Sequence, residues 1–314
     1  MSNAEPTRIR LDIDAPADSG ATLARFGWGV AIADTRVPLQ ALDTSVAELW
    51  MGHGLTRSGS RGAVQFTSDD RWLIGHLYSE AQDIEQAALL TYRALGDFIA
   101  ASEYPCLLRT WNYLDRLNQG QGDDERYRRF CIGRHHAIAQ PGFEARLPAA
   151  TVIGCDAQAP GLRLSFLAGK SPGLQIENPR QTSAFQYPRD YGPVSPSFSR
   201  ATLVGPHLLV SGTAAVVGHA TRHPFDALAQ TDEITANLEA LLAHARGTHF
   251  AGVDGRWAAQ ALRLYVRRPQ DSADAVEHLR NWIPANVPLS VLRGDISRAD
   301  LMVEVEGVWT YTQA

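Results

Sequence analysis

Residues 201–212 read ATLVGPHLLVSG, and this stretch decides the fold. Two runs of apolar residues flank a Gly-Pro pair, a pattern that predicts a β-hairpin. Residues 63–75 show the same pattern, with two apolar runs around a polar turn. The second run of each hairpin leads to a glycine, Gly75 in one and Gly212 in the other. The two hairpins therefore indicate that the chain contains one unit twice.

The elements that follow each hairpin occur in the same order. After the first hairpin we expect a helix (84–99), a strand (107–113), a helix (124–137) and two strands (150–154 and 162–166). After the second we expect a helix (232–247), a strand (261–266), a helix (274–282) and two strands (288–292 and 301–305). The order ββαβαββ, found twice, predicts an α+β fold of two tandem domains, each a mixed sheet with its helices on one face. A chance recurrence of this common order is the alternative.

The chain divides into an N-terminal domain (1–170), a segment at 171–200 and a C-terminal domain (201–314). The middle segment holds five of the 17 prolines, together with aromatic residues and arginines. A plain linker is rich in Gly, Ser or charge, so we expect this segment to lie ordered over a surface or to line a site. A spacer stiffened by proline is the alternative.

Composition limits the function classes. The formal net charge is −5 and no run of Lys and Arg occurs, so we expect no nucleic-acid partner. No apolar stretch is long enough to span a membrane, and residues 1–6 do not resemble a signal peptide. Three widely spaced cysteines and the scattered histidines match no disulfide or metal pattern. We therefore expect a cytoplasmic protein that handles a small molecule, without a metal.

The closing stretch LMVEVEG at 301–307 places two carboxylates on one face of a strand. Glu304 and Glu306 are two residues apart, so their side chains lie about 7 Å apart on that face. Burial and a like-charged neighbour raise the pKa of a carboxyl, which then serves as a general acid near neutral pH. An exposed polar face on an edge strand would give the same pattern.

Three arginines are candidates for binding a carboxylate. Arg134 lies near the end of a predicted helix, Arg146 precedes a predicted strand, and Arg200 ends the middle segment. The guanidinium group forms paired hydrogen bonds with a carboxylate. A solvated helix end or a surface ion pair remains the alternative for each of them.

Gly212 and Thr213 follow directly after an apolar run. A glycine at a strand end permits close approach of a ligand to the backbone, and Thr213 offers N–H and hydroxyl donors. A β-bulge is the alternative.

The second half of the chain resembles the YjgF/RidA fold. The resemblance rests on VSGT at 210–213, the helix with Thr231 and Asn237, LRLYVR at 262–267 and VEVE at 303–306. The first half then looks like a degenerate copy of the same fold.

The whole chain resembles more narrowly the chorismatases, the group of 3-hydroxybenzoate synthases often labelled pteridine-dependent dioxygenase-like. The motifs that carry this resemblance are WNY (111–113), ERYRRF (125–130), GR (133–134), LPAAT (147–151), ENPRQ (177–181), YP (187–188), YGP (191–193) and FSRA (198–201). The resemblance runs from about residue 60 to the end, and the motifs of the middle segment are its most specific part.

The resemblance implies cleavage of chorismate into pyruvate and a ring acid, with no metal or organic cofactor. It implies that Glu304 is the catalytic acid and base, and that Arg134, Arg146 and Tyr187 hold the substrate. Chorismate is a dianion with an enolpyruvyl ether, so arginines and a protonated carboxylic acid suit it.

In this family the residues at two positions are associated with which ring product an enzyme forms. Gly212 favours an aromatic hydroxybenzoate, and we expect the 3-isomer. Ser297 stands where the enzymes that form 3-hydroxybenzoate have cysteine, which leaves the product open.

Two other functions remain open at this point. An imine deaminase like RidA needs the same glutamate and one arginine, but neither the aromatic segment nor the first half. A non-catalytic sensor of a small carboxylate is the second. In the RidA-like trimers sites form between subunits, whereas here a duplicated half could supply the facing surface, so we expect a monomer.

Overall fold

The computed structural model describes residues 7–11, 21–29, 35–139, 142–155 and 160–313. In these ranges the helices are α1 (Ile84–Ala100), α2 (Arg126–Ile138), α3 (Ala227–His249) and α4 (Ser272–Trp282). The strands before α2 are β1 (Thr7–Arg10), β2 (Ala21–Trp28), β3 (Thr35–Val37), β4 (Gln40–Ala41), β5 (Ala47–Gly52), β6 (Arg57–Arg61), β7 (Val64–Ser68), β8 (Trp72–Ser79) and β9 (Cys106–Asp115). The later strands are β10 (Ala149–Cys155), β11 (Leu162–Gly169), β12 (Leu174–Ile176), β13 (Ala201–Val204), β14 (His207–Ala214), β15 (Val216–Val217), β16 (Ala220–Thr221), β17 (Gly255–Val266), β18 (Leu289–Arg293) and β19 (Val303–Gln313).

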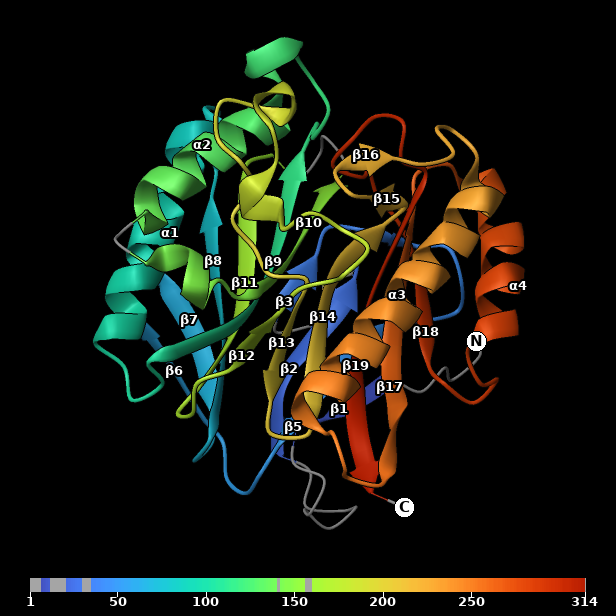
Figure 1. The fold of residues 1–314 in the computed structure, drawn as a ribbon. Helices are drawn as coiled ribbons and strands as arrows, with labels where there is room; N and C mark the ends of the chain where they lie inside the picture. Colours follow the sequence, from blue (N-terminus) through green and yellow to red (C-terminus); the bar gives the residue numbers. More distant parts are fainter. Residues whose placement is uncertain (1–6, 12–20, 30–34, 140–141, 156–159, 314) are drawn as a thin grey trace.

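The fold is a mixed α+β fold, and two of its sheets share one strand order. The first sheet runs β10-β9-β11-β8-β7-β6 and the second runs β12-β13-β14-β19-β17-β18-β4. The strands of the predicted unit occur in the same spatial order in both sheets when one sheet is followed in the opposite direction to the other. The corresponding pairs, β10 with β9 and β18 with β17, are both parallel. Helices α1 and α2 cover one sheet and α3 and α4 cover the other, so that both sheets lie between the helix pairs (Figure 1). The helices and strands expected for the two units are confirmed.

Several predicted boundaries are wrong, and among them are both ends of the helix predicted at 232–247. Helix α3 begins at Ala227 rather than at Asp232, because Asp226 caps it by accepting a hydrogen bond from the N–H of Ala229 at 3.1 Å. The helix also continues past Gly247 to His249, so this glycine does not end it.

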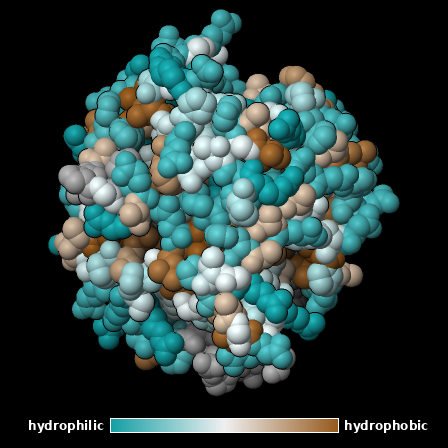
Figure 2. Space-filling view, viewed as in Figure 1, coloured by the Kyte–Doolittle hydropathy of each residue, from teal (hydrophilic) through white to brown (hydrophobic). Residues whose placement is uncertain are grey.

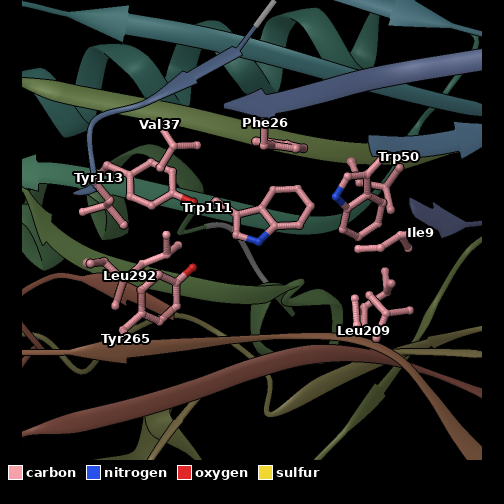
Figure 3. Packing of buried hydrophobic residues seen from close by; sticks show 14 of the residues in the cluster. Ile9, Phe26, Val37, Trp50, Trp111, Tyr113, Leu209, Tyr265 and Leu292 are labelled. Carbon is pink, nitrogen blue, oxygen red and sulfur yellow. The ribbon is translucent and has the colours of Figure 1, made fainter. Parts of the chain in front are cut away.

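The N-terminal part of the chain forms a third sheet that the sequence did not predict. Its order is β1-β5-β2-β3, and its apolar side chains pack against residues of both larger sheets. Figure 3 shows Trp111 of β9 in the middle of this cluster, with the rings of Phe26 and Trp50 nearby. The ring of Trp111 lies 5.3 Å from that of Phe26 and 5.2 Å from that of Trp50. The central core is therefore shared by three sheets.

The two halves also meet along the edge strand β10. Gly154 and Asp295 exchange two backbone hydrogen bonds, of 2.8 and 3.0 Å. At the other end of β10, the N–H of Ser199 donates to the carbonyl oxygen of Pro148 at 3.1 Å. The edge that β10 would otherwise leave open is thus covered by the second half at one end and by the 171–200 segment at the other.

The surface shows no broad apolar area on the face in view. In Figure 2 apolar residues occur there in small patches separated by hydrophilic ones. None of the helices in the described ranges is both long enough and apolar enough to cross a lipid bilayer.

Candidate active site

Glu304 and Glu306 lie on β19, which is a central strand between β14 and β17. Their side chains are 5% and 3% exposed. The alternative of a polar face on an edge strand is therefore wrong, and the face that carries both carboxylates is buried.

Glu306 is held by cations and hydrogen-bond donors from several strands. Arg109 of β9 pairs with one of its carboxylate oxygens at 2.5 Å, and Arg263 of β17 pairs with the other at 3.0 Å. The other donors to this carboxylate are Trp111 at 3.0 Å, Tyr265 at 3.0 Å and the hydroxyl of Thr151. Burial alone would raise the pKa of Glu306, but Arg109, Arg263 and the hydrogen bonds from Thr151 and Tyr265 hold this pKa below its usual range.

The same ionic cluster joins all three sheets. Arg263 also pairs with Glu48 of β5, at 2.5 Å, and Glu48 accepts a hydrogen bond from the indole N–H of Trp50 at 2.6 Å. A buried ion pair is stable only when its geometry and remaining hydrogen bonds are largely satisfied, and in this cluster Nη1 of Arg109 is the buried donor that lacks a partner among the described residues. The cluster fixes β19 relative to β9 and to the N-terminal sheet.

Glu304 has the opposite electrostatic environment. Burial, with the negative charge of Glu306 nearby, raises the pKa of Glu304 to about 8, although Arg109 and Arg200 act against this shift. The carboxyl is therefore protonated at neutral pH. A buried carboxylic acid with such a pKa is suited to general-acid catalysis.

Glu304 lines a cavity of about 310 Å³ between the two halves. The first half contributes the start of α2 and strand β10, and the second half contributes β14 and the loop before β19. The segment 171–200 closes it with aromatic and polar side chains. The lining residues from this segment are Gln181, Tyr187, Asp190, Tyr191, Pro196, Phe198 and Arg200. The segment that we expected to lie over a surface or to line a site thus forms part of the wall of this cavity.

A bulge in β14 brings Gly212 against Glu304. The register between β14 and β19 shifts between Val210 and Thr213, which turns the backbone of Gly212 towards β10. Its N–H donates to the hydroxyl of Thr151 at 2.9 Å. A Cβ added to Gly212 would collide with Oε1 of Glu304. Strand β14 thus continues through this glycine to Ala214, and the close approach at Gly212 involves the carboxyl of Glu304.

Arg200 and Tyr187 meet in this cavity. Arg200 is 5% exposed and donates from Nη2 to the hydroxyl of Tyr187 and to the carbonyl oxygen of Thr182, both at 2.8 Å. Its Nε is buried and has no hydrogen-bond partner among the described residues. A buried donor without a partner is unfavourable, and an anion bound beside Arg200 would supply the missing acceptor.

Arg298 is a site residue that the sequence reasoning missed. Its guanidinium group lies 4.1 Å from the ring centre of Tyr191 and 5.3 Å from that of Tyr187, and it lines the cavity. Its neighbour Ser297 was singled out and lines the same cavity. The position of Arg298 next to Ser297 could have indicated that it belongs to the site, but the sequence around an arginine in a polar loop does not predict a binding role. Arg128 and Tyr127, at the start of α2, were missed as site residues in the same way.

The structure does not bring Arg134 and Arg146 to Glu304. Both line a different cavity, which shares no lining residue with the first among the described residues. Arg134 follows Tyr127 by seven residues on α2, and a helix rises about 1.5 Å per residue, so Arg134 lies about 10 Å further along the helix axis. Its guanidinium group packs on the ring of Tyr92. Arg146 is exposed in a short 3₁₀ helix before β10.

Thr213 is also outside the cavity lining. It is buried, and its hydroxyl donates to the carbonyl oxygen of Ser211 at 3.0 Å. Of the eight residues predicted for the site, the cavity thus brings together five, which are Glu304, Tyr187, Arg200, Gly212 and Ser297.

The described residues contain no group of three or more His, Cys, Asp and Glu side chains placed to hold a metal ion. The three cysteines are unpaired with one another. The chemistry that these residues offer is acid catalysis by Glu304 beside two arginines, in a cavity with an aromatic wall.

Several known proteins are similar to this chain in sequence or in fold. Residues 48–168 match the family described as "Chorismatase FkbO/Hyg5-like, N-terminal". A chorismatase from Streptomyces rapamycinicus is 36% identical over 85% of this chain and 83% of the relative. A 3-hydroxybenzoate synthase from Streptomyces hygroscopicus is 32% identical over 83% of this chain and 81% of the relative. A crystal structure of a chorismatase, 27% identical, superposes with a TM-score of 0.77 and covers 95% of each chain. The chain belongs to the chorismatase family.

Proposed function

We propose that this protein cleaves chorismate into pyruvate and a hydroxybenzoate, with Glu304 as the acid. The names of the relatives support the substrate. The observation that carries the mechanism is the raised pKa of a buried glutamic acid that lines a cavity together with Arg200 and Arg298.

The charges of the cavity suit a dianionic substrate. Chorismate carries one carboxylate on its ring and one on its enolpyruvyl group. Arg200 has one N–H, at Nε, without a partner among the described residues, and Arg298 lies over two tyrosine rings while its Nη1 donates to the hydroxyl of Thr221 at 3.2 Å. We assign the two carboxylates to these arginines, in the role that the sequence reasoning gave to Arg134 and Arg146.

The reaction starts with a proton transfer from Glu304 to the methylene carbon of the enolpyruvyl ether. The C=C electron pair forms the new C–H bond and leaves an oxocarbenium ion, which the Glu304 carboxylate then stabilises. The ring hydroxyl oxygen loses its proton and forms a bond to the neighbouring ring carbon, while the bond between that carbon and the ether oxygen breaks and pyruvate departs with the ether oxygen. The resulting epoxide opens at the carbon that first carried the hydroxyl, and its oxygen takes up a proton. Loss of a ring proton to Glu304 then gives the aromatic ring and restores the acid. No water is consumed.

We propose 3-hydroxybenzoate as the ring product. An attack within the substrate needs no ordered water, and formation of an aromatic ring is strongly favourable. Gly212 lies against the Glu304 carboxyl, and Ser297 lines the same cavity, so we assign to its hydroxyl the orientation of the ring. Water as the nucleophile would instead give a non-aromatic dihydrodiol acid.

We further propose that the chain is two tandem domains of the YjgF/RidA type and acts as a monomer. The shared strand order of the two sheets supports the duplication. The Glu304 cavity takes residues from both halves of one chain, so no second copy is needed to complete it.

Incubation of the purified protein with chorismate, followed by chromatography for pyruvate and ring acids, tests this function. We expect equal amounts of pyruvate and 3-hydroxybenzoate. Release of ammonia from a small imino acid, without cleavage of chorismate, would instead identify an imine deaminase. Binding of chorismate without turnover would identify a sensor.

A further inference from the structure

A second cavity, of about 530 Å³, lies on the first half of the chain, away from the residues around Glu304. It is lined by the end of α1, the start of β9, the later turns of α2, residues before β10 and the start of the 171–200 segment. Its apolar lining includes Leu95, Ile99, Leu107, Ile138 and Leu147. A cavity of this size is within the range of small-molecule sites.

Arg134 is the buried cation of this cavity. Its side chain is 3% exposed, and its Nε has no hydrogen-bond partner among the described residues. The guanidinium plane lies 4.8 Å from the ring centre of Tyr92, so the ring covers one face and leaves the N–H edge for another partner. The Tyr92 hydroxyl is already bound, since it donates to Asn112 at 2.7 Å.

No carboxylate of the protein neutralises Arg134 in the described part of the cavity. The described lining contains two arginines, Arg134 and Arg146, and no Asp or Glu. A buried cation without a counter-ion is costly, and an anion in the cavity would remove that cost. Arg146 is exposed and adds a second positive charge to the wall.

The apolar lining selects among anions. Inorganic phosphate would leave these aliphatic side chains in contact with a strongly hydrated ion. A planar ring with one carboxylate would place its charge on Arg134 and its apolar body against Leu95, Ile99 and Leu147. We propose that this cavity is a second binding site, for an aromatic carboxylate. That the natural ligand is the hydroxybenzoate product rests on the proposed function.

Strand β10 connects this site to the Glu304 cavity. Leu147 and Pro148, just before the strand, line the second cavity, whereas Ala150 and Thr151 line the first. The N–H of Ala149, between them, donates to the hydroxyl of Thr202 at 2.8 Å, and Thr202 also lines the second cavity. A ligand that shifts Pro148 or Thr202 would therefore act on the strand that carries Thr151.

Calorimetric titration with benzoate tests the second site in four proteins: wild type, Arg134→Met, Arg146→Gln and Arg200→Met. Methionine preserves the apolar contact of Arg134 with Tyr92 but removes its charge and donors. We expect benzoate to bind Arg200→Met, because that variant changes only the first cavity. We expect Arg134→Met to weaken this binding roughly tenfold or more and Arg146→Gln to weaken it less. Phosphate, which lacks the ring, and phenol, which lacks the charge, should bind none of the four proteins at the same concentrations.

Unchanged benzoate binding in a folded Arg134→Met, or loss of binding in Arg200→Met, would overturn the proposal. If circular dichroism shows that Arg134→Met does not fold, crystals of the wild type soaked in 4-bromobenzoate decide. A bromine peak beside Tyr92 supports the site, and a peak confined to the Glu304 cavity overturns it. The chorismate assay on the wild type tests the proposed reaction separately. Pyruvate release without benzoate binding at this cavity would contradict only the second site. Benzoate binding there without pyruvate release would contradict only the proposed reaction.

Discussion

Glu304 and Glu306 lie two residues apart on the same buried face of β19, yet their pKa values move in opposite directions. Glu306 pairs with Arg109 and Arg263, whereas Glu304 faces the cavity beside the negative charge of Glu306. One carboxyl is thereby kept charged, and the charge helps to keep the other protonated. Such divergence between neighbouring titratable groups is typical of acid-base sites.

The pH dependence of turnover should report the protonated form of Glu304. Because the pKa of Glu304 is raised to about 8, kcat should be steady near neutral pH and fall as the pH rises above 8. Glu306→Gln removes the neighbouring negative charge, so the pKa of Glu304 should fall and the decline in kcat should begin at lower pH. Rates of pyruvate release between pH 5 and 10 measure both profiles. A decline at the same pH in both proteins would show that Glu306 does not set the pKa of the acid.

Stability should depend on pH through the same carboxyl. The folded-state pKa of about 8 exceeds the value of about 4.3 in an unfolded chain, so the folded state binds this proton more tightly. The contribution of Glu304 to stability is therefore complete below about pH 4 and is lost as the pH rises to about 8. Glu304→Gln should gain relative stability over this window, by up to about 1.4 kcal/mol per pH unit. Urea unfolding at pH 5 and pH 8 measures the difference between the two proteins, and a constant difference would contradict the raised pKa.

Arg200 and Arg298 should act on substrate binding. Replacing either by lysine keeps the charge but removes the paired hydrogen bonds, so KM for chorismate should rise roughly tenfold or more. Arg256→Met, at an exposed position outside the cavity, is the matched control and should keep the wild-type KM. Steady-state kinetics of the three variants checks this assignment. If both lysine variants keep the wild-type KM, the carboxylates are bound elsewhere.

Product choice should depend on Gly212 and Ser297. The methyl group of Gly212→Ala collides with Oε1 of Glu304, so the carboxyl must move. We expect slower turnover and a shift of some product from 3-hydroxybenzoate to the dihydrodiol acid. Ser297→Cys should keep or increase the share of 3-hydroxybenzoate. Chromatography of the reaction mixtures decides, and a wild type that forms mainly dihydrodiol acid or 4-hydroxybenzoate would contradict both assignments.

The regular elements were predictable because their apolar residues repeat with the period of a strand or a helix. The hairpins at 63–75 and 201–212 and the elements after them follow such patterns. The N-terminal sheet was not predictable in this way. Its strands β1 and β3 are only four and three residues long, and its stability depends on packing against two distant sheets.

The site was predictable where one local pattern sufficed. Alternation along β19 places Glu304 on the same face as Glu306, and the composition of the aromatic segment indicated that it lines a site. The position of Gly212 depends on the bulge in β14, which the sequence offered only as an alternative. Arg134 was singled out in the sequence and Arg298 was not, yet it is Arg298 that lines the Glu304 cavity. Arg134 is placed by the packing of α2 on the first sheet, and Arg298 by the path of the loop before β19. Both are properties of tertiary packing.

The central claim, that Glu304 supplies the proton for cleavage, is tested most directly by Glu304→Gln. Glutamine keeps the shape of the side chain and removes the acidic proton, so pyruvate release should fall by a factor of at least about 10² while calorimetry still detects chorismate binding. Glu125→Gln, which alters another carboxyl of the cavity, should cost far less activity. Pyruvate release by a folded Glu304→Gln at a rate close to that of the wild type would contradict the role of Glu304 as the acid.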